Sequence, residues 1–238
     1  MEKKELELSV IIPAYKEMEN LAILIPEIEE KFKDVTTEII VVDDNSQDGT
    51  EKLIEELNKK FQNVRIITRP ALNGVGSALR DGYNAALGTY ILSADADLCL
   101  PVKDMVRLYQ KIKEGFDMAI GYRYGSHGYY EKKSLVIRMK YLISRPGSIL
   151  LKLITGIHLK DFSNNSRIMR RDKWLTLKTY ENGNAFLFEI ILKAARKGLT
   201  IAEIPISCYE RKIGKSKLNL WKEAPKSLYK LFKYALFP

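Results

Sequence analysis

The sequence predicts an α/β protein in which a mostly parallel central sheet carries helices on both faces, followed by an amphipathic helical segment at the C-terminus. Short β-branched runs alternate with helical patterns along the first half of the chain, which is typical of βαβ crossovers. Polar clusters follow several of the strands, and open parallel sheets bind ligands at that edge. The length of 238 residues suits one large domain.

The first half contains four predicted strands with a helix after each of the first three. The strand at 8–12 is closed by Pro13, and its apolar, β-branched composition is that of a buried parallel strand. Apolar residues at helical spacing predict the helix that follows it. The other strands are predicted at 39–42, 64–68 and 89–93, and the helices at 20–32, 50–57 and 73–86.

The second half is less regular. We expect a helix at 102–114, a strand at 118–120, a loop rich in Gly and Tyr at 123–133, a helix at 185–196 and a strand at 200–205. The apolar segment 135–154 carries interspersed basic residues and is broken at Pro146 and Gly147, so its helices either pack into the core or lie on a membrane.

The C-terminal tail at 221–237 places apolar residues on one helix face and lysines around the other. Docking of the apolar face on the domain and binding to a membrane surface both explain this pattern. We therefore divide the chain into a domain at 1–218 and a basic amphipathic helix at 219–238.

The formal net charge of +9 favours anionic partners such as phosphorylated small molecules, nucleic acid or an anionic membrane surface. No apolar run approaches the roughly 18 to 20 residues that cross a bilayer. The charged N-terminus lacks the pattern of a signal peptide, so we expect a cytoplasmic protein that is peripheral at the membrane. Cys99 and Cys208 are far apart in sequence, without the spacing of a metal site or a disulfide framework.

Two aspartates, Asp95 and Asp97, directly follow the predicted strand at 89–93. Side chains two residues apart on a strand point to the same face, so the two carboxylates lie together and repel each other. A divalent cation bound with phosphate oxygens relieves that repulsion. The motif alone also fits a solvated loop, but residues 13–15 and 43–44 end two other strands at the same edge of the sheet.

Two further motifs suit anionic ligands. Gly74 and Gly76 open the helix predicted at 73–86, where backbone N–H groups can approach a phosphate or ribose or where the glycines simply allow a tight turn. Residues 211–217 gather four cations, which fits a solvated basic loop or, beside a carboxylate-bound metal, a clamp for phosphate groups. His127 and His158 show no ligand spacing.

Several ordered motifs resemble those of inverting family 2 glycosyltransferases with the GT-A fold. In the first half they are Val10-Ile11-Ile12-Pro13-Ala14-Tyr15-Lys16-Glu17, Val41-Val42-Asp43-Asp44-Asn45-Ser46-Gln47-Asp48-Gly49-Thr50 and Asp95-Ala96-Asp97-Leu98. Gly121-Tyr122-Arg123-Tyr124, 161–167, Phe186-x-x-Glu189 and 211–218 are similar to the dolichol-phosphate mannose synthase branch. The resemblance runs from about Leu8 to Tyr234.

The resemblance implies a role for individual residues. Asp95 and Asp97 would hold Mg²⁺ or Mn²⁺ against the donor diphosphate. The implied catalytic residues are Asp97, Arg123, Asp161 and Arg211, and the implied substrate-binding residues are Pro13, Tyr15, Glu17, Asp43, Asp44, Gly74, Asp95, Arg167, Ser216 and Lys217. The oxygen of a polyprenyl phosphate is already anionic, whereas a sugar hydroxyl would need Asp161 or Glu189 as a base.

Three departures from the family pattern bear on the donor, the acceptor or both, and the pocket residues named above recognise a nucleotide without specifying the sugar or the nucleobase. Cys99 stands where the family often has a glutamine metal ligand, and a soft thiol is a poor partner for a hard cation. Leu72 replaces a frequent lysine, and residues 163–166 replace a Thr-Ser-Gly-Phe-like stretch.

The chain is thus expected to transfer mannose or glucose from a GDP- or UDP-hexose to a polyprenyl (dolichyl) phosphate at the cytoplasmic membrane face. A GT-A enzyme with a soluble saccharide or protein acceptor is the alternative. Membrane attachment would use the tail or a small membrane-anchoring subunit. A non-catalytic anion- or nucleic-acid-binding module ranks last, and no nucleic acid is expected as a partner, because no base-stacking motif accompanies the basic residues.

Overall fold

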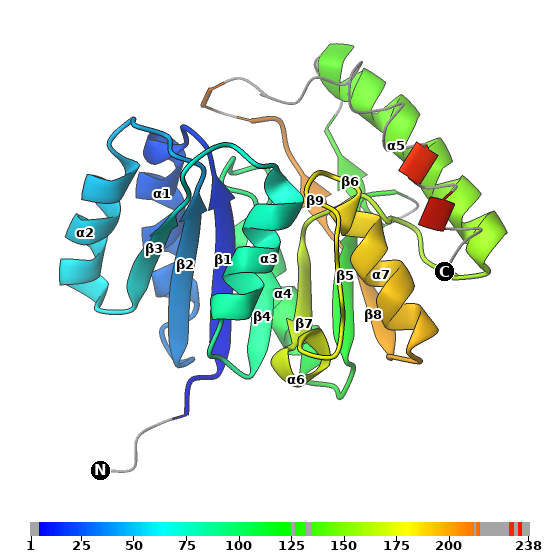
Figure 1. The fold of residues 1–238 in the computed structure, drawn as a ribbon, viewed down its shortest axis with the longest axis horizontal. Helices are drawn as coiled ribbons and strands as arrows, with labels where there is room; N and C mark the ends of the chain where they lie inside the picture. The colour runs from blue at the N-terminus through cyan, green and yellow to red at the C-terminus, as the bar shows by residue number, and fades with distance from the viewer. Residues whose placement is uncertain are drawn as a thin grey trace.

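A seven-stranded sheet forms the centre of the protein, in the order β3-β2-β1-β4-β7-β5-β8 (Figure 1). The computed structural model describes residues 5–124, 127–131, 135–211, 213–214, 229–230 and 233–234. The strands are β1 (Leu8–Ala14), β2 (Thr37–Asp43), β3 (Val64–Thr68), β4 (Tyr90–Ser93), β5 (Met118–Tyr122), β7 (Arg167–Arg170) and β8 (Ile201–Pro205). All the pairs are parallel except the two that β7 makes, with β4 and β5.

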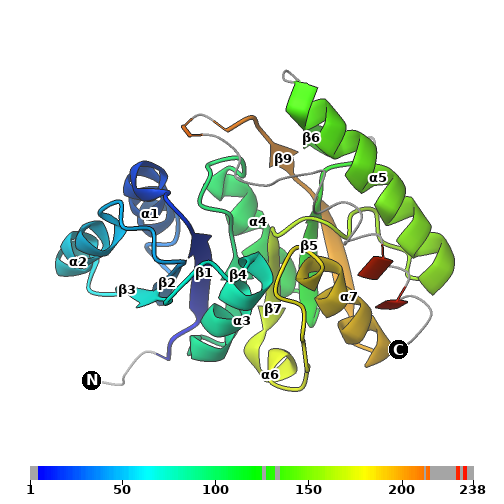
Figure 2. The ribbon, with the colours of Figure 1, turned by 45° about the horizontal axis from the view of Figure 1, so that its top comes forward.

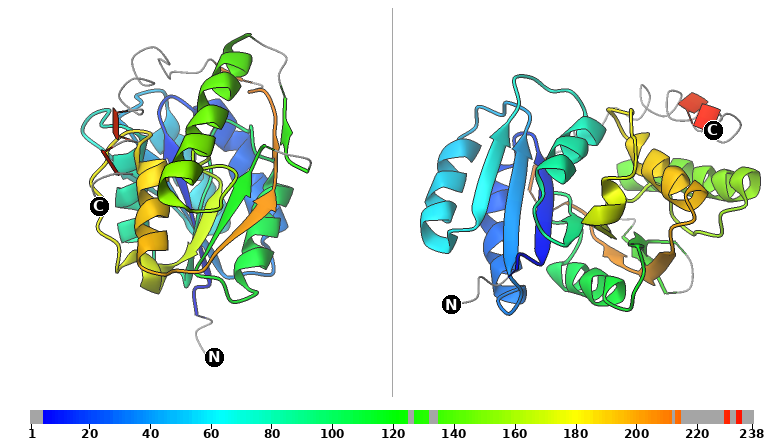
Figure 3. Two further views of the ribbon diagram at one scale, coloured as in Figure 1. Left: turned by 90° about the vertical axis from the view of Figure 1, so that its right-hand side faces the viewer. Right: turned by 60° about the horizontal axis from the view of Figure 1, so that its bottom comes forward.

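Helices cover both faces of the sheet, as predicted (Figure 3). One core cluster joins the sheet to α1 (Met18–Lys31), α2 (Thr50–Phe61) and α4 (Val102–Ile112). The other joins it to α3 (Val75–Ala85), α6 (Arg171–Trp174) and α7 (Phe186–Arg196). Strands β1 and β2 are buried on both faces, which explains their continuous apolar sequence.

Strand β1 continues through Pro13 instead of ending before it. Pro13 pairs with Val42 in the parallel register, whereas the pairing of β1 with β4 stops at Ile11 and Ser93. The Ile11 carbonyl accepts from Ala94 N, so Pro13, two residues on, turns its missing N–H toward the same side, beyond the end of β4. The proline therefore removes no ladder hydrogen bond, and the expected stop at this position was wrong.

The sequence pattern did not reveal β7, which enters the middle of the sheet antiparallel to its neighbours. It has only four residues and an arginine at each end. Two short strands, β6 (Tyr129–Tyr130) and β9 (Ser207–Cys208), pair with each other, so part of the expected loop at 123–133 is a strand.

Helix α5 (Leu135–Thr155) runs through Pro146, so the predicted break at Pro146 and Gly147 is wrong. A proline keeps a helical φ and costs mainly the hydrogen bond to the carbonyl four residues earlier, here that of the exposed Leu142, which water can reach. The helix packs through Leu151 and Ser148, whose Oγ accepts from Phe162 N at 3.2 Å. It forms an outer edge of the molecule, away from α1 and α2 (Figure 2).

Four residues of the C-terminal tail, 229–230 and 233–234, are described and are helical. Lys230 pairs with Glu181, and Tyr234 OH lies 3.2 Å from carboxylate oxygens of Glu181 and Glu189. These contacts dock the described part of the tail on α7 and the loop before it. The rest of the predicted helix at 219–238 lies outside the described residues. Among the helices that the structure describes, none is long and apolar enough to cross a membrane.

Candidate active site

The carboxyl ends of β1, β2 and β4 meet at one rim of the sheet, as their parallel register requires. This is the point where the chain, after adding strands on one side of β1, continues on the other side. Asp44 N donates to Ala14 O at 3.0 Å, and Lys16 N donates to Ser46 Oγ at 2.7 Å. The predicted convergence of the polar clusters is confirmed for these two strand ends.

The two aspartates follow β4 in a tight turn. Cys99 N donates to Asp97 Oδ1 at 3.1 Å, and Leu98 has a positive φ of 58°. Asn165 Nδ2 donates to Asp95 Oδ1 at 2.9 Å. Burial and the charge of Asp97 raise the pKa of Asp95 to about 6. Arg123 and Arg211 act in the opposite direction but do not offset burial and the Asp97 charge.

Arg211 bridges two carboxylates at this rim. Its Nη1 lies 2.8 Å from Glu17 Oε1 and its Nη2 lies 3.1 Å from Asp97 Oδ2. Burial alone would lower the pKa of Arg211, but Asp97 and Glu17 raise it above its usual value. Glu17 is buried and also accepts from Asn20 Nδ2 at 2.6 Å. The two ion pairs of Arg211 therefore connect the loop after β1 to the loop after β4.

Arg123, directly after β5, forms a bidentate pair with Asp161. The Nε–Oδ2 and Nη2–Oδ1 distances are 2.7 and 3.1 Å, and Asp161 is fully buried. Burial would lower the pKa of Arg123, but the Asp161 charge raises it well above its usual value. The guanidinium also stands over the rings of Tyr124 and Tyr130, 5.3 and 5.4 Å from their centroids.

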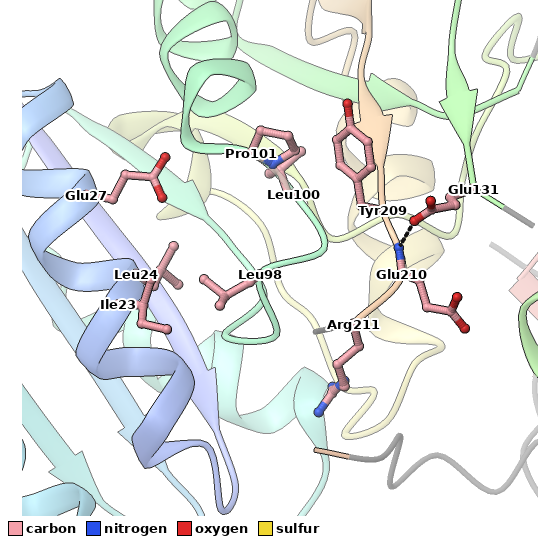
Figure 4. Close-up of a pocket in the computed structure, with 10 residues that line it drawn as sticks. All are labelled: Ile23, Leu24, Glu27, Leu98, Leu100, Pro101, Glu131, Tyr209, Glu210 and Arg211. Carbon is pink, nitrogen blue, oxygen red and sulfur yellow. Dashed lines mark hydrogen bonds between the residues drawn. The ribbon is translucent and has the colours of Figure 1, made fainter. Parts of the chain in front are cut away.

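Two cavities are lined by these charged residues, the smaller by Asp95, Asp97 and Arg123 and the larger by Arg211. The smaller, of about 160 Å³, is lined by Asp95, Asp97 and Arg123 together with Cys99, Leu100, Tyr130, Glu131, Asn164, Ser166, Ile206, Cys208 and Tyr209. Burial raises the pKa of the Cys99 and Cys208 thiols, the latter to about 11, so both are uncharged near neutral pH. The larger cavity, of about 610 Å³, lies between α1 and the segment that carries Tyr209 and Arg211 (Figure 4).

The residues at the end of β2 form a second polar cluster, held together by hydrogen bonds and ion pairs within it. Asp43 accepts from the backbone N and the hydroxyl of Ser46. Asp44 pairs with Arg69 at 3.1 Å, and Arg69 also lies 3.5 Å from Asp81. Burial raises the pKa of Asp44 in spite of Arg69. Arg69, which the sequence analysis did not select, is therefore the residue that holds Asp44 in place.

Pro13, near the C-terminal end of β1, and Tyr15, directly after the strand, are both partly exposed. Lys16 Nζ stands 5.5 Å from the centroid of the Tyr15 ring. Tyr15 therefore lies at the same rim as the carboxylates of β2 and β4.

Gly74 and Gly76 pack against the loop at 181–183. A Cβ on Gly74, which has a φ of +89°, would lie 2.4 Å from Asn182 O, and one on Gly76 would lie 2.5 Å from Phe186 Cβ. Ser77 N donates to Asn182 O at 3.0 Å, so a carbonyl of the chain itself caps α3. This geometry supports the tight-turn interpretation of the two glycines and not the phosphate interpretation.

Arg167 lies beneath the site and not in it. Its side chain is fully buried and donates to the carbonyls of Leu187, at 2.8 Å, and of Asn164. Burial lowers its pKa. Glu189 is likewise buried, and its two oxygens accept from the backbone N–H groups of Tyr180 and Glu181, both at 2.9 Å. Both side chains therefore have a structural explanation.

Two predicted site residues, Ser216 and Lys217, lie outside the described residues. Arg69 and Asn165, as well as Tyr130 and Tyr209 at the smaller cavity, are residues of the site that the sequence pattern does not predict. An arginine directly after a predicted strand was a usable signal for Arg69. Nothing local signals Asn165, because its contact with Asp95 spans 70 residues of sequence.

Asp95 and Asp97 fit a hard divalent cation. Carboxylate oxygens suit Mg²⁺ or Mn²⁺, and in this structure one oxygen of Asp97 is paired with the Arg211 guanidinium at 3.1 Å. Within the described part of the chain, no third His, Cys, Asp or Glu joins them in a cluster that could hold a metal ion. Such a pair resembles Mg²⁺ sites that are completed by substrate phosphates and water.

The fold and the rim of carboxylates and arginines define a GT-A glycosyltransferase. The family model for glycosyl transferase family 2 matches residues 9–175, and the chain belongs to this family. It is 33% identical over 218 residues to a dolichol-phosphate mannosyltransferase of Pyrococcus furiosus. The aligned region covers 90% of this chain and 60% of that protein. It is 28% identical over 217 residues to a polyprenol monophosphomannose synthase of Mycolicibacterium smegmatis, covering 88% of this chain and 80% of that protein.

The chain thus spans less than two thirds of the Pyrococcus relative. Among solved structures, a glucosyl-3-phosphoglycerate synthase from Mycobacterium tuberculosis, in complex with Mn²⁺, UDP and glucosyl-3-phosphoglycerate, has a TM-score of 0.74. Its sequence identity is 20%, with 98% of this chain and 81% of that chain covered, so the likeness concerns the fold.

Proposed function

We propose that this protein transfers a hexose from a nucleoside diphosphate sugar to a polyprenyl phosphate, with inversion at the anomeric carbon. The observation that carries the proposal is the convergence of Arg211 and Arg123 on the carboxylate pair after β4. One rim then offers a site for a cation–diphosphate pair and two guanidinium groups suited to phosphate. The names of the Pyrococcus and Mycolicibacterium relatives support a polyprenyl phosphate acceptor and mannose as the sugar.

In this mechanism the protein places the donor diphosphate and the acceptor phosphate on opposite sides of the anomeric carbon of the sugar. The residues after β1 and β2, Tyr15, Glu17 and Asp44, would line the nucleotide side, and Asp95 and Asp97 would hold Mg²⁺ or Mn²⁺ beside the diphosphate. A divalent cation bound there neutralises charge that develops on the departing diphosphate.

Arg123 and Arg211 orient the acceptor phosphate. One of its oxygens forms the new bond to the anomeric carbon as the bond to the diphosphate breaks, and no proton has to be removed. This fits the carboxylates that the structure describes around the site, because Asp161 is committed to Arg123 and Glu189 to backbone N–H groups. A hydroxyl acceptor would need one of them free as a base.

A membrane surface is the proposed location of the acceptor. On α5, the exposed side chains of Leu142, Ile149 and Leu153 are 67, 51 and 75% accessible and share one stripe of the helix. Arg145 and Lys152 are exposed beside them. An apolar stripe with flanking cations suits an anionic lipid surface. A small membrane-anchoring subunit is a second possible means of attachment.

The test is transfer of labelled sugar from GDP-mannose, GDP-glucose, UDP-glucose and related donors to dolichyl phosphate, with Mg²⁺, Mn²⁺ or EDTA. We expect label in the lipid fraction with one donor and with metal, and its loss in Asp97→Asn. Asp172→Asn, which removes an exposed carboxylate of α6, is the matched control and keeps activity. Labelling of phosphoglycerate or a saccharide, with none of the lipid, would favour the soluble-acceptor alternative.

A further inference from the structure

Asn165 contacts the carboxylate pair from the buried side of the site. Its Nδ2 donates to Asp95 Oδ1 at 2.9 Å, and the side chain is 4% exposed. We propose that Asn165 is a positioning residue for the metal-binding carboxylate, which fixes one oxygen of Asp95 so that the other is held toward the cation. The proposal rests on the function proposed above, because it takes Asp95 and Asp97 as the metal ligands.

The antiparallel strand β7 explains how Asn165 reaches Asp95. Ser93 pairs with Arg167 at the end of the β4–β7 register, and continuing that register by two residues on each strand brings position 95 opposite position 165. Asn165 O accepts from Ser93 Oγ at 2.7 Å, and Ser93 Oγ accepts from Tyr83 OH at 2.9 Å. The backbone of Asn165 is therefore fixed to β4 two residues before the aspartate that its side chain contacts.

The side chain of Asn165 is poorly suited to a packing role alone. Its Oδ1 is buried and has no hydrogen-bond partner among the described residues, and such an oxygen destabilises a fold. Turning the amide around would place this oxygen against the Asp95 carboxylate. An apolar side chain of the same shape would fill the space without that cost. What the amide adds is the hydrogen bond donated to Asp95.

The experiment compares Mn²⁺ binding with stability. Asn165→Leu keeps the shape and removes the donor, so we expect the dissociation constant for Mn²⁺, followed by the EPR signal of free Mn²⁺, to rise about tenfold or more. The melting temperature of the metal-free variant should stay the same or rise. Tyr83→Phe breaks the buried hydrogen bond behind the same loop, and it should lower the melting temperature but leave Mn²⁺ binding unchanged. Asn165→Ala serves if the leucine variant does not fold.

Three outcomes overturn the proposal, and they are distinguishable. Wild-type Mn²⁺ affinity in Asn165→Leu or Asn165→Ala shows that Asp95 needs no support from Asn165. Equal weakening by Asn165→Leu and Tyr83→Phe shows that loop packing, not the donated bond, sets the affinity. If wild type itself gives no saturable Mn²⁺ binding and Asp97→Asn behaves identically, the metal site fails and this inference falls with it.

Discussion

Arg211 holds Asp97 across 114 residues of sequence, with Nη2 and Oδ2 3.1 Å apart. The guanidinium therefore occupies a carboxylate oxygen that a metal ion would need. Loading of a cation with the donor diphosphate would displace Arg211 from Asp97 and release it toward phosphate. We therefore predict that the donor and its cation bind before the acceptor phosphate.

Arg211→Ala should bind Mn²⁺ more tightly than wild type when no nucleotide is present. Removal of one competing, partly exposed ion pair corresponds to about a two- to fivefold change in affinity. Turnover should nevertheless fall by about 100-fold, because the same guanidinium would stabilise phosphate charge. Titration with EPR detection and initial rates measure the two effects separately.

A suitable control is Arg170→Ala, which removes an exposed arginine paired with Asp172. It should change neither quantity. Weaker Mn²⁺ binding in Arg211→Ala would contradict the competition and would mean that the arginine supports the metal site.

Mn²⁺ binding should weaken as the pH falls through about 6, the pKa of Asp95. A ligand carboxylate must be ionised, and at pH 5 only about one tenth of such a group is ionised, so affinity should drop about tenfold between pH 7 and pH 5. Affinity measured at pH 5, 6 and 7 tests this, and a constant value would refute it.

Asp95 should also make the stability of the metal-free protein depend on pH, in the direction opposite to that of Mn²⁺ affinity. Its pKa is raised on folding from 3.8, so between about pH 4 and 6 the folded state binds more protons than the unfolded state. The contribution of Asp95 to the free energy of unfolding therefore falls as the pH rises through this window and is constant above it. Melting temperatures of the metal-free protein should show this trend, and the stabilisation by added Mn²⁺ should grow over the same range.

Loss of the Arg123 partner should be costly. Asp161→Asn leaves the Arg123 guanidinium, only 13% accessible, without its counter-charge, and we expect the free energy of unfolding to fall by about 3 kcal/mol. Asp172→Asn breaks an exposed pair whose side chains are 57 and 41% accessible, and it should cost less than about 1 kcal/mol. Urea denaturation of both variants measures the difference. Similar small losses in both would show that the Arg123 pair is not a buried support of the site.

The parallel part of the site could be predicted because its determinants are local. Each β-branched run identifies a strand, and parallel strands bring the residues that follow them to one rim, so the sequence predicts Tyr15, Asp44 and Asp97 at the same edge. The four-residue strand β7 could not be found in this way, because arginines flank it and its pairing partners are distant in sequence. Asn165 was missed for the same reason. Its role depends on a register that only the folded sheet defines.

Proline and glycine do not mark the ends of elements by residue type alone. Their effect depends on whether the fold uses the N–H that proline lacks or the space that glycine leaves. The pattern predicts a stop at both Pro13 and Pro146, but each lies where a missing N–H removes little, beyond the end of β4 in one case and in an exposed turn of α5 in the other. The pattern correctly predicts that Gly74 and Gly76 open a helix: Gly74 is the N-cap of α3 and Gly76 lies in its first turn. The two glycines are needed because a Cβ at either position would clash with residues 181–183 or their neighbour Phe186, a contact that no local sequence pattern identifies.

Glu189→Gln distinguishes a structural carboxylate from a catalytic base. Glu189 accepts two backbone N–H groups and the Lys193 ammonium, at 2.7 Å, so replacing one oxygen by a donor amide should lower the free energy of unfolding by about 1–3 kcal/mol. The folded variant should keep kcat with a polyprenyl phosphate within about twofold. Glu203→Gln, whose carboxylate accepts Lys160 N at 2.7 Å, is the matched control for losing a backbone acceptor. A 100-fold loss of kcat at unchanged stability would instead identify Glu189 as a base, because an anionic phosphate nucleophile has no proton to give up. That result would favour a hydroxyl acceptor over the lipid phosphate.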